Sequence, residues 1–160
     1  MEKSVAGRLN RDGIRIHSKG DFAGMHASGQ VAAQILDDIA VHVKPGVSTA
    51  HLDDLIRGMI GDHGATSATI GYKGYQHASC ISVNHVVCHG IPSEKTLRDG
   101  DILNIDVTVI LDGWFGDTSR MFVAGKPSRK AERLMDITHE ALIRGIAAVK
   151  PGDRFGDIGA

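Results

Sequence analysis

The first half of the chain carries apolar residues at the spacing of one helix face. From Phe22 to Val43 they recur every three or four positions, which predicts an amphipathic helix. Asp21 is expected to be its N-cap, and the run Lys44-Pro45-Gly46 is expected to end it. A second helix is predicted to start at Ser48 or Thr49 and to end at Gly64.

Strand-like runs fill the middle of the chain, and a third amphipathic helix follows them. Strands are expected at 66–70, 79–83, 86–89, 102–110 and 114–123. The third helix is expected from about Ser128 to Val149. Helices that flank an antiparallel sheet predict an α+β fold.

Two of the strand-like runs each carry an aspartate among β-branched or aromatic residues. Asp-Gly at 112–113 favours a tight hairpin, in which Thr108 faces Asp117 and Asp106 faces Ser119. The two acids then form a diagonal cross-strand pair, with Cβ atoms about 7–8 Å apart. A buried carboxylate needs a proton, a partner or a metal. Asp106 and Asp117 are therefore candidate metal ligands, and the alternative is a pair of solvent-facing acids.

The chain has two cysteines, Cys80 and Cys88. A hairpin at 84–85 would place Cys80 opposite His89 and Ile81 opposite Cys88, so that the cysteines point to opposite faces and form no disulfide. Free thiols are typical of the cytoplasm. Cys88 is expected to be a small buried side chain, whereas Cys80 is expected beside His89.

Length and charge set further bounds. A chain of 160 residues is long enough for one sizeable core. A net charge of −1 gives no reason to expect nucleic-acid binding, and no apolar run reaches the length of a membrane span. Residues 1–20 lack the apolar segment of a signal peptide and are expected to be a flexible or loosely docked leader, with one domain over 21–160.

A short repeat indicates internal symmetry. Val43-Lys-Pro-Gly46 recurs as Val149-Lys-Pro-Gly152, each time after an amphipathic helix, and Leu52 and Ile158 follow their prolines at the same distance. The repeat predicts that the chain is the first part of a pseudo-symmetric protein. The alternative is coincidence, because Pro-Gly often follows a helix.

Two loops carry further candidates. His89 precedes Gly-Ile-Pro, a rigid turn from which it would act as acid, base or hydrogen-bond donor, unless it is an ordinary loop histidine. The run 71–75 holds Tyr72 and Tyr75 between glycines, and forms either an apolar pocket wall or a plain turn. It lacks the Gly-Lys-Ser/Thr ending of a phosphate loop.

Several of these motifs together resemble bacterial type I methionine aminopeptidase. The resemblance runs from about Phe22 to the end of the chain and rests on Gly71-Tyr-Lys-Gly-Tyr75, Cys80-Ile-Ser-Val-Asn84, Val87-Cys-His-Gly-Ile-Pro92, Asn104-Ile-Asp-Val-Thr108 and Gly116-Asp-Thr-Ser119. It implies the pitta-bread (creatinase/aminopeptidase) fold, of which this chain is largely the N-terminal half. It also implies removal of the initiator methionine from nascent proteins in the cytoplasm.

The resemblance assigns roles to the candidates. Asp106 matches a chelating carboxylate and Asp117 a carboxylate that bridges two divalent ions, which are Co, Fe, Mn or Zn. His89 matches a histidine that contacts the substrate near the scissile amide without binding metal. The family's other ligands, one histidine and two glutamates, lie in its second half together with a further catalytic histidine.

The resemblance also defines a substrate pocket and its surroundings. Tyr72, Tyr75 and Cys80 match residues that line the pocket for the methionine side chain, and the backbone near Asn84 and Val86 matches a monovalent-cation loop. Where many relatives have histidine in the Gly-Tyr-His-Gly-Tyr loop, this chain has a lysine at position 73. The implied partners are nascent polypeptides and the ribosome, and the implied state is a monomer. The alternatives are a non-catalytic pitta-bread domain and an Xaa-Pro-type metallopeptidase.

Overall fold

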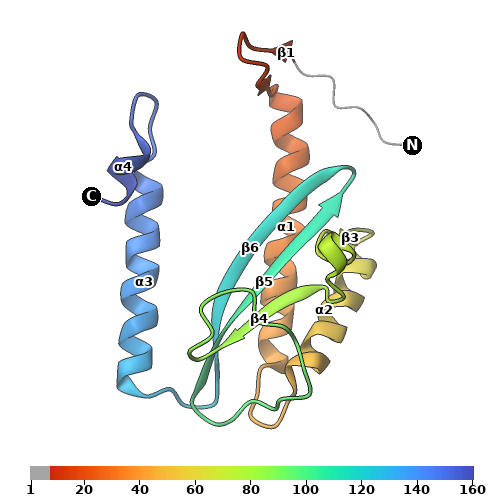
Figure 1. Ribbon diagram of the computed structural model, residues 1–160, viewed down its shortest axis with the longest axis vertical. Helices are drawn as coiled ribbons and strands as arrows, with labels where there is room; N and C mark the ends of the chain where they lie inside the picture. The colour runs from red at the N-terminus through yellow and green to blue at the C-terminus, as the bar shows by residue number, and fades with distance from the viewer. Residues whose placement is uncertain (1–7) are drawn as a thin grey trace.

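The computed structural model describes residues 8–160, and a central antiparallel sheet organises them (Figure 1). The helices are α1 (Lys19–Ile39), α2 (Thr49–Asp62), α3 (Arg129–Ala148) and α4 (Phe155–Ile158), with short 3-10 turns η1 (Ala40–His42) and η2 (Tyr72–Gly74). The strands are β1 (Arg8–Leu9), β2 (Arg15–Ile16), β3 (Thr66–Ser67), β4 (Ser79–Val83), β5 (Asp101–Leu111) and β6 (Trp114–Ala124). Residues 8–16 of the expected leader form a small exposed hairpin, and residues 1–7 of the expected leader lie outside the described residues.

Helix α1 starts earlier than its hydrophobic pattern indicated. Ser18, not Asp21, is the N-cap, and the two residues form a capping box in which Asp21 Oδ2 accepts from the Ser18 amide at 2.6 Å. The prediction of Asp21 as the cap was wrong because Asp21 occupies the third helical position, where its carboxylate accepts from the amide of the N-cap residue. These hydrogen bonds from Ser18 also lower the pKa of the Asp21 carboxyl.

The other predicted helix starts are confirmed. The hydroxyl of Ser48 accepts from the His51 amide at 3.2 Å, and the hydroxyl of Ser128 accepts from the Ala131 amide at 3.2 Å. Each satisfies an amide that has no partner inside its helix. Gly64 follows the end of α2 with a φ of +68°, as a glycine stop requires.

The β5–β6 hairpin has the register that the sequence predicted. Thr108 pairs with Asp117 and Asp106 pairs with Ser119 along an uninterrupted antiparallel ladder. The turn residues Asp112 and Gly113 have φ angles of +51° and +85°. Both values are positive, as the tight turn that matches strand twist requires.

The expected strand at 86–89 is absent, and the hairpin predicted at 84–85 is wrong. After β4 the chain turns at Asn84, whose φ is +54°, and β4 pairs with β5 instead. Only Gly90 returns to β4: its carbonyl accepts from the Ile81 amide at 2.8 Å, and its amide donates to the Ser82 hydroxyl at 3.0 Å. A side chain at Gly90 would overlap the Ile81 carbonyl. The loop is therefore joined to β4 at Gly90, and the strand propensity of its valines does not reveal this contact.

The lost hairpin changes the surroundings of both cysteines. Cys80 lies opposite Asp106 of β5, not opposite His89. Cys88 is exposed, so the prediction of a buried side chain is wrong, and both cysteines are free thiols. Strand β3 is also shorter than expected and covers only Thr66–Ser67.

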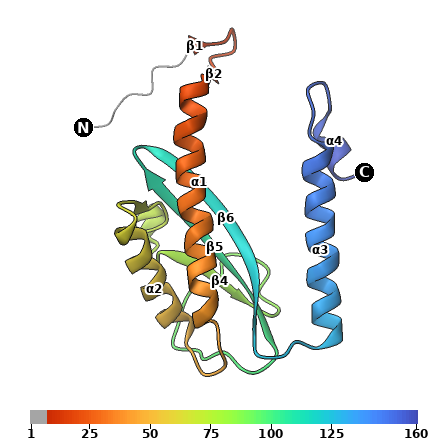
Figure 2. The ribbon, with the colours of Figure 1, turned by 180° about the vertical axis from the view of Figure 1, so that it is seen from behind.

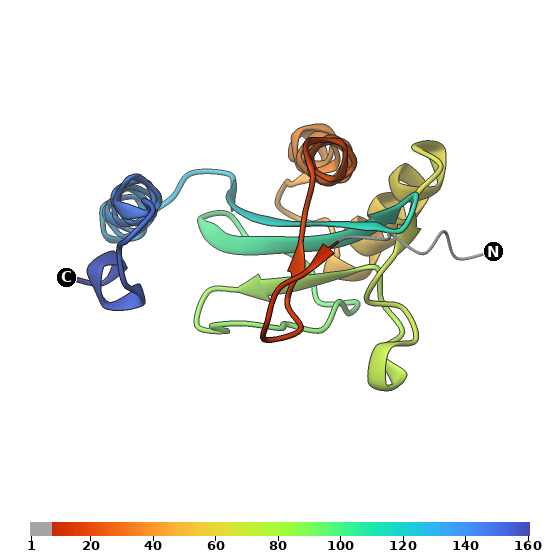
Figure 3. The ribbon, with the colours of Figure 1, turned by 90° about the horizontal axis from the view of Figure 1, so that it is seen from above.

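One face of the sheet carries the hydrophobic core. Helices α1 and α2 lie on this face, and the loop with η2 lies on the other (Figures 2 and 3). Alternate residues of β5 point toward the helices and are fully buried: Leu103, Ile105, Val107 and Val109. Gly116 of β6 lets α1 approach closely, because a side chain there would overlap the Ser28 carbonyl.

The repeated Val-Lys-Pro-Gly run has the same conformation in both copies. Val43 and Val149 have φ, ψ of −76°, 94° and −74°, 110°, and Gly46 and Gly152 have φ of +89° and +98°. Each turn leads into a helix that begins three residues after its glycine. The two runs thus share their local structure as well as their sequence. The symmetry of a larger protein remains a prediction.

The two copies differ in what covers them. Helix α3 packs mainly on α4 and stands away from the sheet in all three ribbon views, so the expectation that it flanks the sheet is wrong. Its large apolar residues are mostly half-exposed or more, including Leu134, Ile137 and Leu142. Amphipathic periodicity shows that a helix has an apolar face but not what covers that face. Among the described residues, no helix has the length and apolarity of a membrane span.

Candidate active site

The sheet face opposite α1 and α2 carries the polar residues that the sequence singled out. Asn104, Asp106 and Thr108 point to this face, because they alternate with the buried residues of β5. From β6, Ser119 accepts a hydrogen bond from the Asn104 amide group at 3.2 Å, and Asp117 accepts one from the Thr108 hydroxyl at 3.0 Å. This face, called the open face below, holds both aspartates on rigid strands.

The two aspartates act on each other electrostatically. Burial raises the pKa of the Asp106 carboxyl, the charge of Asp117 raises it further, and His89 opposes both effects. Like charges held close together disfavour ionisation unless a cation compensates them. The open face therefore favours a bound cation, and it brings His89 within electrostatic reach of Asp106.

An open pocket of about 620 Å³ adjoins the aspartates. Its walls are mostly apolar and include Tyr72, Tyr75, Cys80, His89, Thr108 and Phe115. The four pocket residues expected from the resemblance thus line one cavity. His89 is exposed and has a φ of +54°, so its backbone conformation is one that non-glycine residues adopt rarely. It reaches the cavity through the turn before Gly90 and not through the hairpin that the sequence suggested.

A short hydrogen-bond chain fixes one wall of the pocket. The Cys80 thiol donates to the Tyr75 hydroxyl at 3.5 Å, and that hydroxyl donates to the Ser79 carbonyl at 2.9 Å. Burial is the main cause that raises the pKa of both Tyr75 and Cys80. Both groups therefore stay neutral at physiological pH, which suits a pocket for an apolar side chain.

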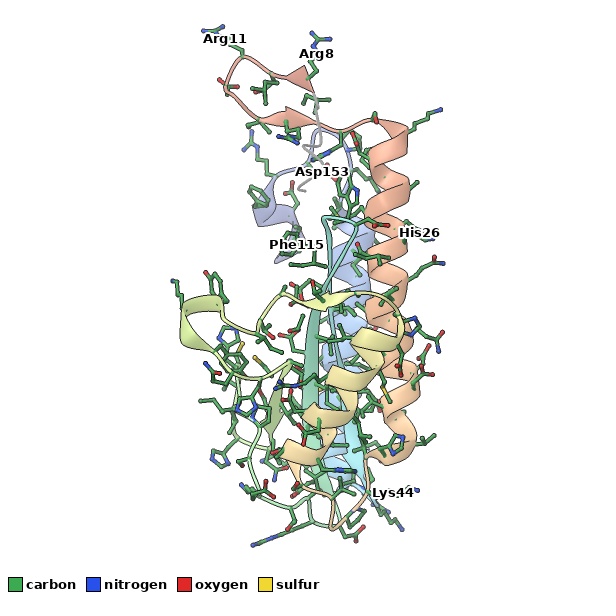
Figure 4. The ribbon with its side chains drawn as sticks, turned by 90° about the vertical axis from the view of Figure 1, so that its right-hand side faces the viewer. Arg8, Arg11, His26, Lys44, Phe115 and Asp153 are labelled. Atoms are coloured by element: carbon green, nitrogen blue, oxygen red, sulfur yellow. The ribbon has the colours of Figure 1, made fainter. Side chains whose placement is uncertain are left out.

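Two pocket residues were missed as candidates. Phe115 lies on the face of the hairpin opposite α1 (Figure 4). It is two residues before Asp117 on the same strand, so the period of two would have placed it on the open face. The sequence placed Thr108 opposite Asp117. It did not show that Thr108 lines the pocket, because this depends on where the η2 loop lies.

The pocket rim carries one lysine. Lys73 has a φ of +48°, and its ammonium lies 5.5 Å from the centre of the Tyr72 ring. This distance allows a cation–π interaction, of modest strength because both side chains are exposed. The lysine thus adds a positive charge to the lining of a mostly apolar pocket.

The donor groups on the open face fit part of a divalent metal site. Asp106 and Asp117 supply carboxylates, but nowhere in residues 8–160 do three or more His, Cys, Asp or Glu side chains group in a way that would hold a metal. Transition metals prefer mixed nitrogen and oxygen ligands. The two carboxylates therefore fit a site that needs further ligands.

The structure shows an α+β layer with two aspartates on a strand hairpin beside an apolar pocket. Comparison with known proteins agrees with these features. The model of Metallopeptidase family M24 matches residues 23–160. The chain belongs to this family of metallopeptidases, and its fold is the pitta-bread fold of that family.

The relatives include methionine aminopeptidases. A crystal structure of methionine aminopeptidase from Rickettsia prowazekii is 53% identical, has a TM-score of 0.89, and is matched over 91% of this chain and 59% of that chain. Methionine aminopeptidase of Escherichia coli (strain K12) is 50% identical over 92% of this chain and 56% of its own length. Prolidase from Pyrococcus furiosus shares the fold at 21% identity and a TM-score of 0.79, over 89% of this chain and 41% of that chain. The chain spans 56% of the length of the Escherichia coli relative.

Proposed function

We propose that this chain carries the substrate pocket and two metal-binding carboxylates of a methionine aminopeptidase, which removes the initiator methionine from nascent proteins. The observation that carries the proposal is that one sheet face brings Asp106 and Asp117 beside His89 and an apolar, sulfur- and aromatic-lined pocket. The 50–53% identity to methionine aminopeptidases supports methionine over the Xaa-Pro substrates of more distant relatives. The presence of both aspartates and His89 argues against a purely non-catalytic domain.

Asp106 and Asp117 would hold two divalent ions, which are Co, Fe, Mn or Zn. Such ions supply Lewis acidity and an activated water near neutral pH. Thr108 holds one oxygen of Asp117 in place, at 3.0 Å, so the carboxylate is oriented before any ligand arrives. The remaining ligands, one histidine and two glutamates, would come from outside these 160 residues.

The pocket residues would recognise the methionine side chain. Tyr72, Tyr75 and Cys80 present aromatic surface and sulfur, and a flexible thioether packs well against both. His89 would donate a hydrogen bond to the scissile peptide group and stabilise charge that develops on its carbonyl oxygen. Its position at the junction of the pocket and Asp106 suits this role.

The wider proposal follows from the same assignment. Residues 21–160 would be the N-terminal part of the catalytic domain, and 1–20 a leader. The enzyme would act as a monomer in the cytoplasm on chains that leave the ribosome. A monovalent cation near Asn84 and Val86 would bind backbone carbonyls, because the Asn84 side chain is already engaged by Asp101 at 2.8 Å and by the Ile102 amide at 3.1 Å.

The test is release of methionine from a Met-Gly-Met peptide with added divalent metal. Two forms are compared: the 160-residue chain, and the same chain continued by any coding sequence that follows Ala160. We expect activity in the continued form, lost on Asp106→Asn. Activity in the 160-residue chain would mean that dimerisation or other groups complete the ligand set. Failure of both forms with every metal, while the protein is folded, would contradict the proposal.

A further inference from the structure

A buried carboxylate lies behind the pocket wall, on the opposite side from the aspartates of the open face. Asp53 of α2 is 1% exposed and lies far from the metal-binding strands in sequence. A buried carboxylate is costly unless several donors surround it.

The hydrogen bonds of Asp53 all go to one short segment. Its Oδ1 accepts from the Ser79 amide at 2.8 Å and from the Ser79 hydroxyl at 2.7 Å, and its Oδ2 lies 3.1 Å from Nδ1 of His77. Arg57, one helical turn further along α2, approaches Oδ2 at 3.8 Å and donates to the Gln76 carbonyl at 2.9 Å. Helix α2 thus binds residues 76–79 through the side chains of Asp53 and Arg57.

Residues 76–79 join the two residues that form the sulfur and aromatic wall of the pocket. Tyr75 precedes it and Cys80 follows it, and the Tyr75 hydroxyl donates to the carbonyl of Ser79, the same residue whose amide Asp53 accepts. His77 also packs edge-on against the Tyr75 ring, with 5.5 Å between ring centres. Asp53 therefore holds Ser79 and His77, and both of these residues contact Tyr75.

The other side of the segment is held by uncharged groups. The Thr69 hydroxyl donates to the His77 carbonyl at 2.7 Å, and the Ser67 hydroxyl donates to the Ala78 carbonyl at 3.5 Å. These bonds fix the segment to the β3 loop but make no contact with the Ser79 amide. Among the described residues, Asp53 alone accepts a hydrogen bond from the Ser79 amide.

We propose that Asp53 is a positioning residue for the substrate pocket: it fixes Ser79 and His77, and through them the Tyr75–Cys80 wall that contacts the methionine side chain. The proposal rests on the proposed function. It predicts that loss of Asp53 changes substrate binding and side-chain selectivity. The steps at the scissile bond, which the proposed function assigns to Asp106, Asp117 and His89, are expected to be little affected.

The test measures KM and kcat for a methionyl peptide and for a leucyl analogue, in the form of the protein that releases methionine. Asp53→Ala is expected to raise KM for the methionyl peptide by about tenfold, to leave kcat within about twofold, and to reduce the preference for methionine over leucine. Asp54→Ala, an exposed neighbour on the same helix, is the matched control and is expected to leave all values unchanged.

A second pair of variants keeps the test valid if Asp53→Ala does not fold. His77 is partly exposed, so His77→Ala is expected to fold and to raise KM by about threefold. His77→Asn keeps a donor at a similar distance from Cβ and is expected to restore the wild-type KM. Wild-type KM and selectivity in a folded Asp53→Ala or in His77→Ala would overturn the proposal, as would a loss in kcat alone.

Amide hydrogen exchange separates this proposal from the proposed function. His77→Ala is expected to speed exchange of the Ser79 amide relative to other β4 amides, whether or not the protein is an enzyme. If the wild type releases no methionine, the proposed function fails, while the exchange result still shows whether Asp53 and His77 anchor the wall. Unchanged Ser79 exchange in His77→Ala would overturn the anchoring itself.

Discussion

The two faces of the β5–β6 hairpin differ in nearly every physical respect. On the covered face, Ile105 and Val107 are fully buried beneath α1 and α2. On the open face, Asp106 and Asp117 lie beside a pocket, and burial with mutual repulsion raises the pKa of Asp106. Adjacent residues of one strand thus differ in role: one packs in the core and the next carries a charge toward the pocket. The covered face supplies stability, and this allows the open face to hold charges that are unfavourable until a cation binds.

The largest effect is expected where the covered face meets α1 most closely. Gly116→Ala would place a methyl group against the Ser28 carbonyl, which is backbone and cannot move aside easily. We expect a loss of about 3 kcal/mol or more in the free energy of unfolding, measured by urea denaturation. Phe115→Ala, on the open face and 55% exposed, is the control and should cost less than about 1.5 kcal/mol. Equal losses would show that the two faces are packed alike.

A cavity on the covered face is expected to have the next largest effect. Ile105→Ala should cost about 2–5 kcal/mol, because the side chain is fully buried among α1 and α2 residues. Ile110→Ala removes the same atoms from a partly exposed position on the open face and should cost about half as much or less. Chemical denaturation of both variants gives the comparison. A larger loss at Ile110 would contradict the assignment of the faces.

Removing a charge from the open face is expected to stabilise the metal-free protein. The folded pKa of Asp106 is raised above its ordinary value of 3.8, so the folded state holds this proton more tightly than the unfolded state. The associated stability is present below that value and is lost as the pH rises through the folded pKa. Asp106→Asn should therefore raise the free energy of unfolding at pH 7 in a chelator, with a gain that shrinks toward pH 3.8.

The control for this pH experiment is Asp54→Asn, because Asp54 is exposed and belongs to α2, which lies on the other face of the sheet. Its gain at pH 7 should be smaller than that of Asp106→Asn. A destabilising effect of Asp106→Asn at pH 7 without metal would mean that a group on the protein already compensates its charge.

The smallest change in unfolding free energy is expected at Thr108. Thr108→Val removes the hydroxyl that donates to Asp117 at 3.0 Å, at a cost of about 1 kcal/mol or less because both groups are accessible to water. Its effect should appear instead in metal dependence, with the Mn²⁺ concentration for half-maximal methionine release raised about tenfold. Thr108→Ser, which keeps the hydroxyl, should remain close to the wild type. An unchanged Mn²⁺ dependence in Thr108→Val would show that Asp117 needs no support.

The hairpin was predictable because every determinant of it is local. Asp112-Gly113 sets the turn, and the period of two then places Asp106 and Asp117 on one face. The loop at 86–89 was not predictable, since its course depends on the close packing of Gly90 on the Ile81 backbone. The shared pocket of Cys80 and His89 was expected for the wrong reason, through a hairpin that does not form.

Long-range contacts account for the other gaps. Nothing local indicates that Asp53 meets Ser79, 26 residues away. The apolar face of α3 was visible in its periodicity, yet among the described residues α3 packs mainly on α4 and most of its large apolar side chains stay exposed. The resemblance to methionine aminopeptidases supplied the proposed roles of Tyr72 and Tyr75, because loop composition alone left open a pocket wall and a plain turn.

The most direct test of the central claim compares two neighbouring residues on opposite faces of β5. Asp106→Asn and Ile105→Val are measured for unfolding free energy and for methionine release per folded molecule. The account predicts that Asp106→Asn loses about 100-fold or more in activity without loss of metal-free stability. Ile105→Val should lose about 0.5–1.5 kcal/mol of stability with nearly unchanged activity. Full activity of Asp106→Asn, at a metal concentration that saturates the wild type, would contradict the account.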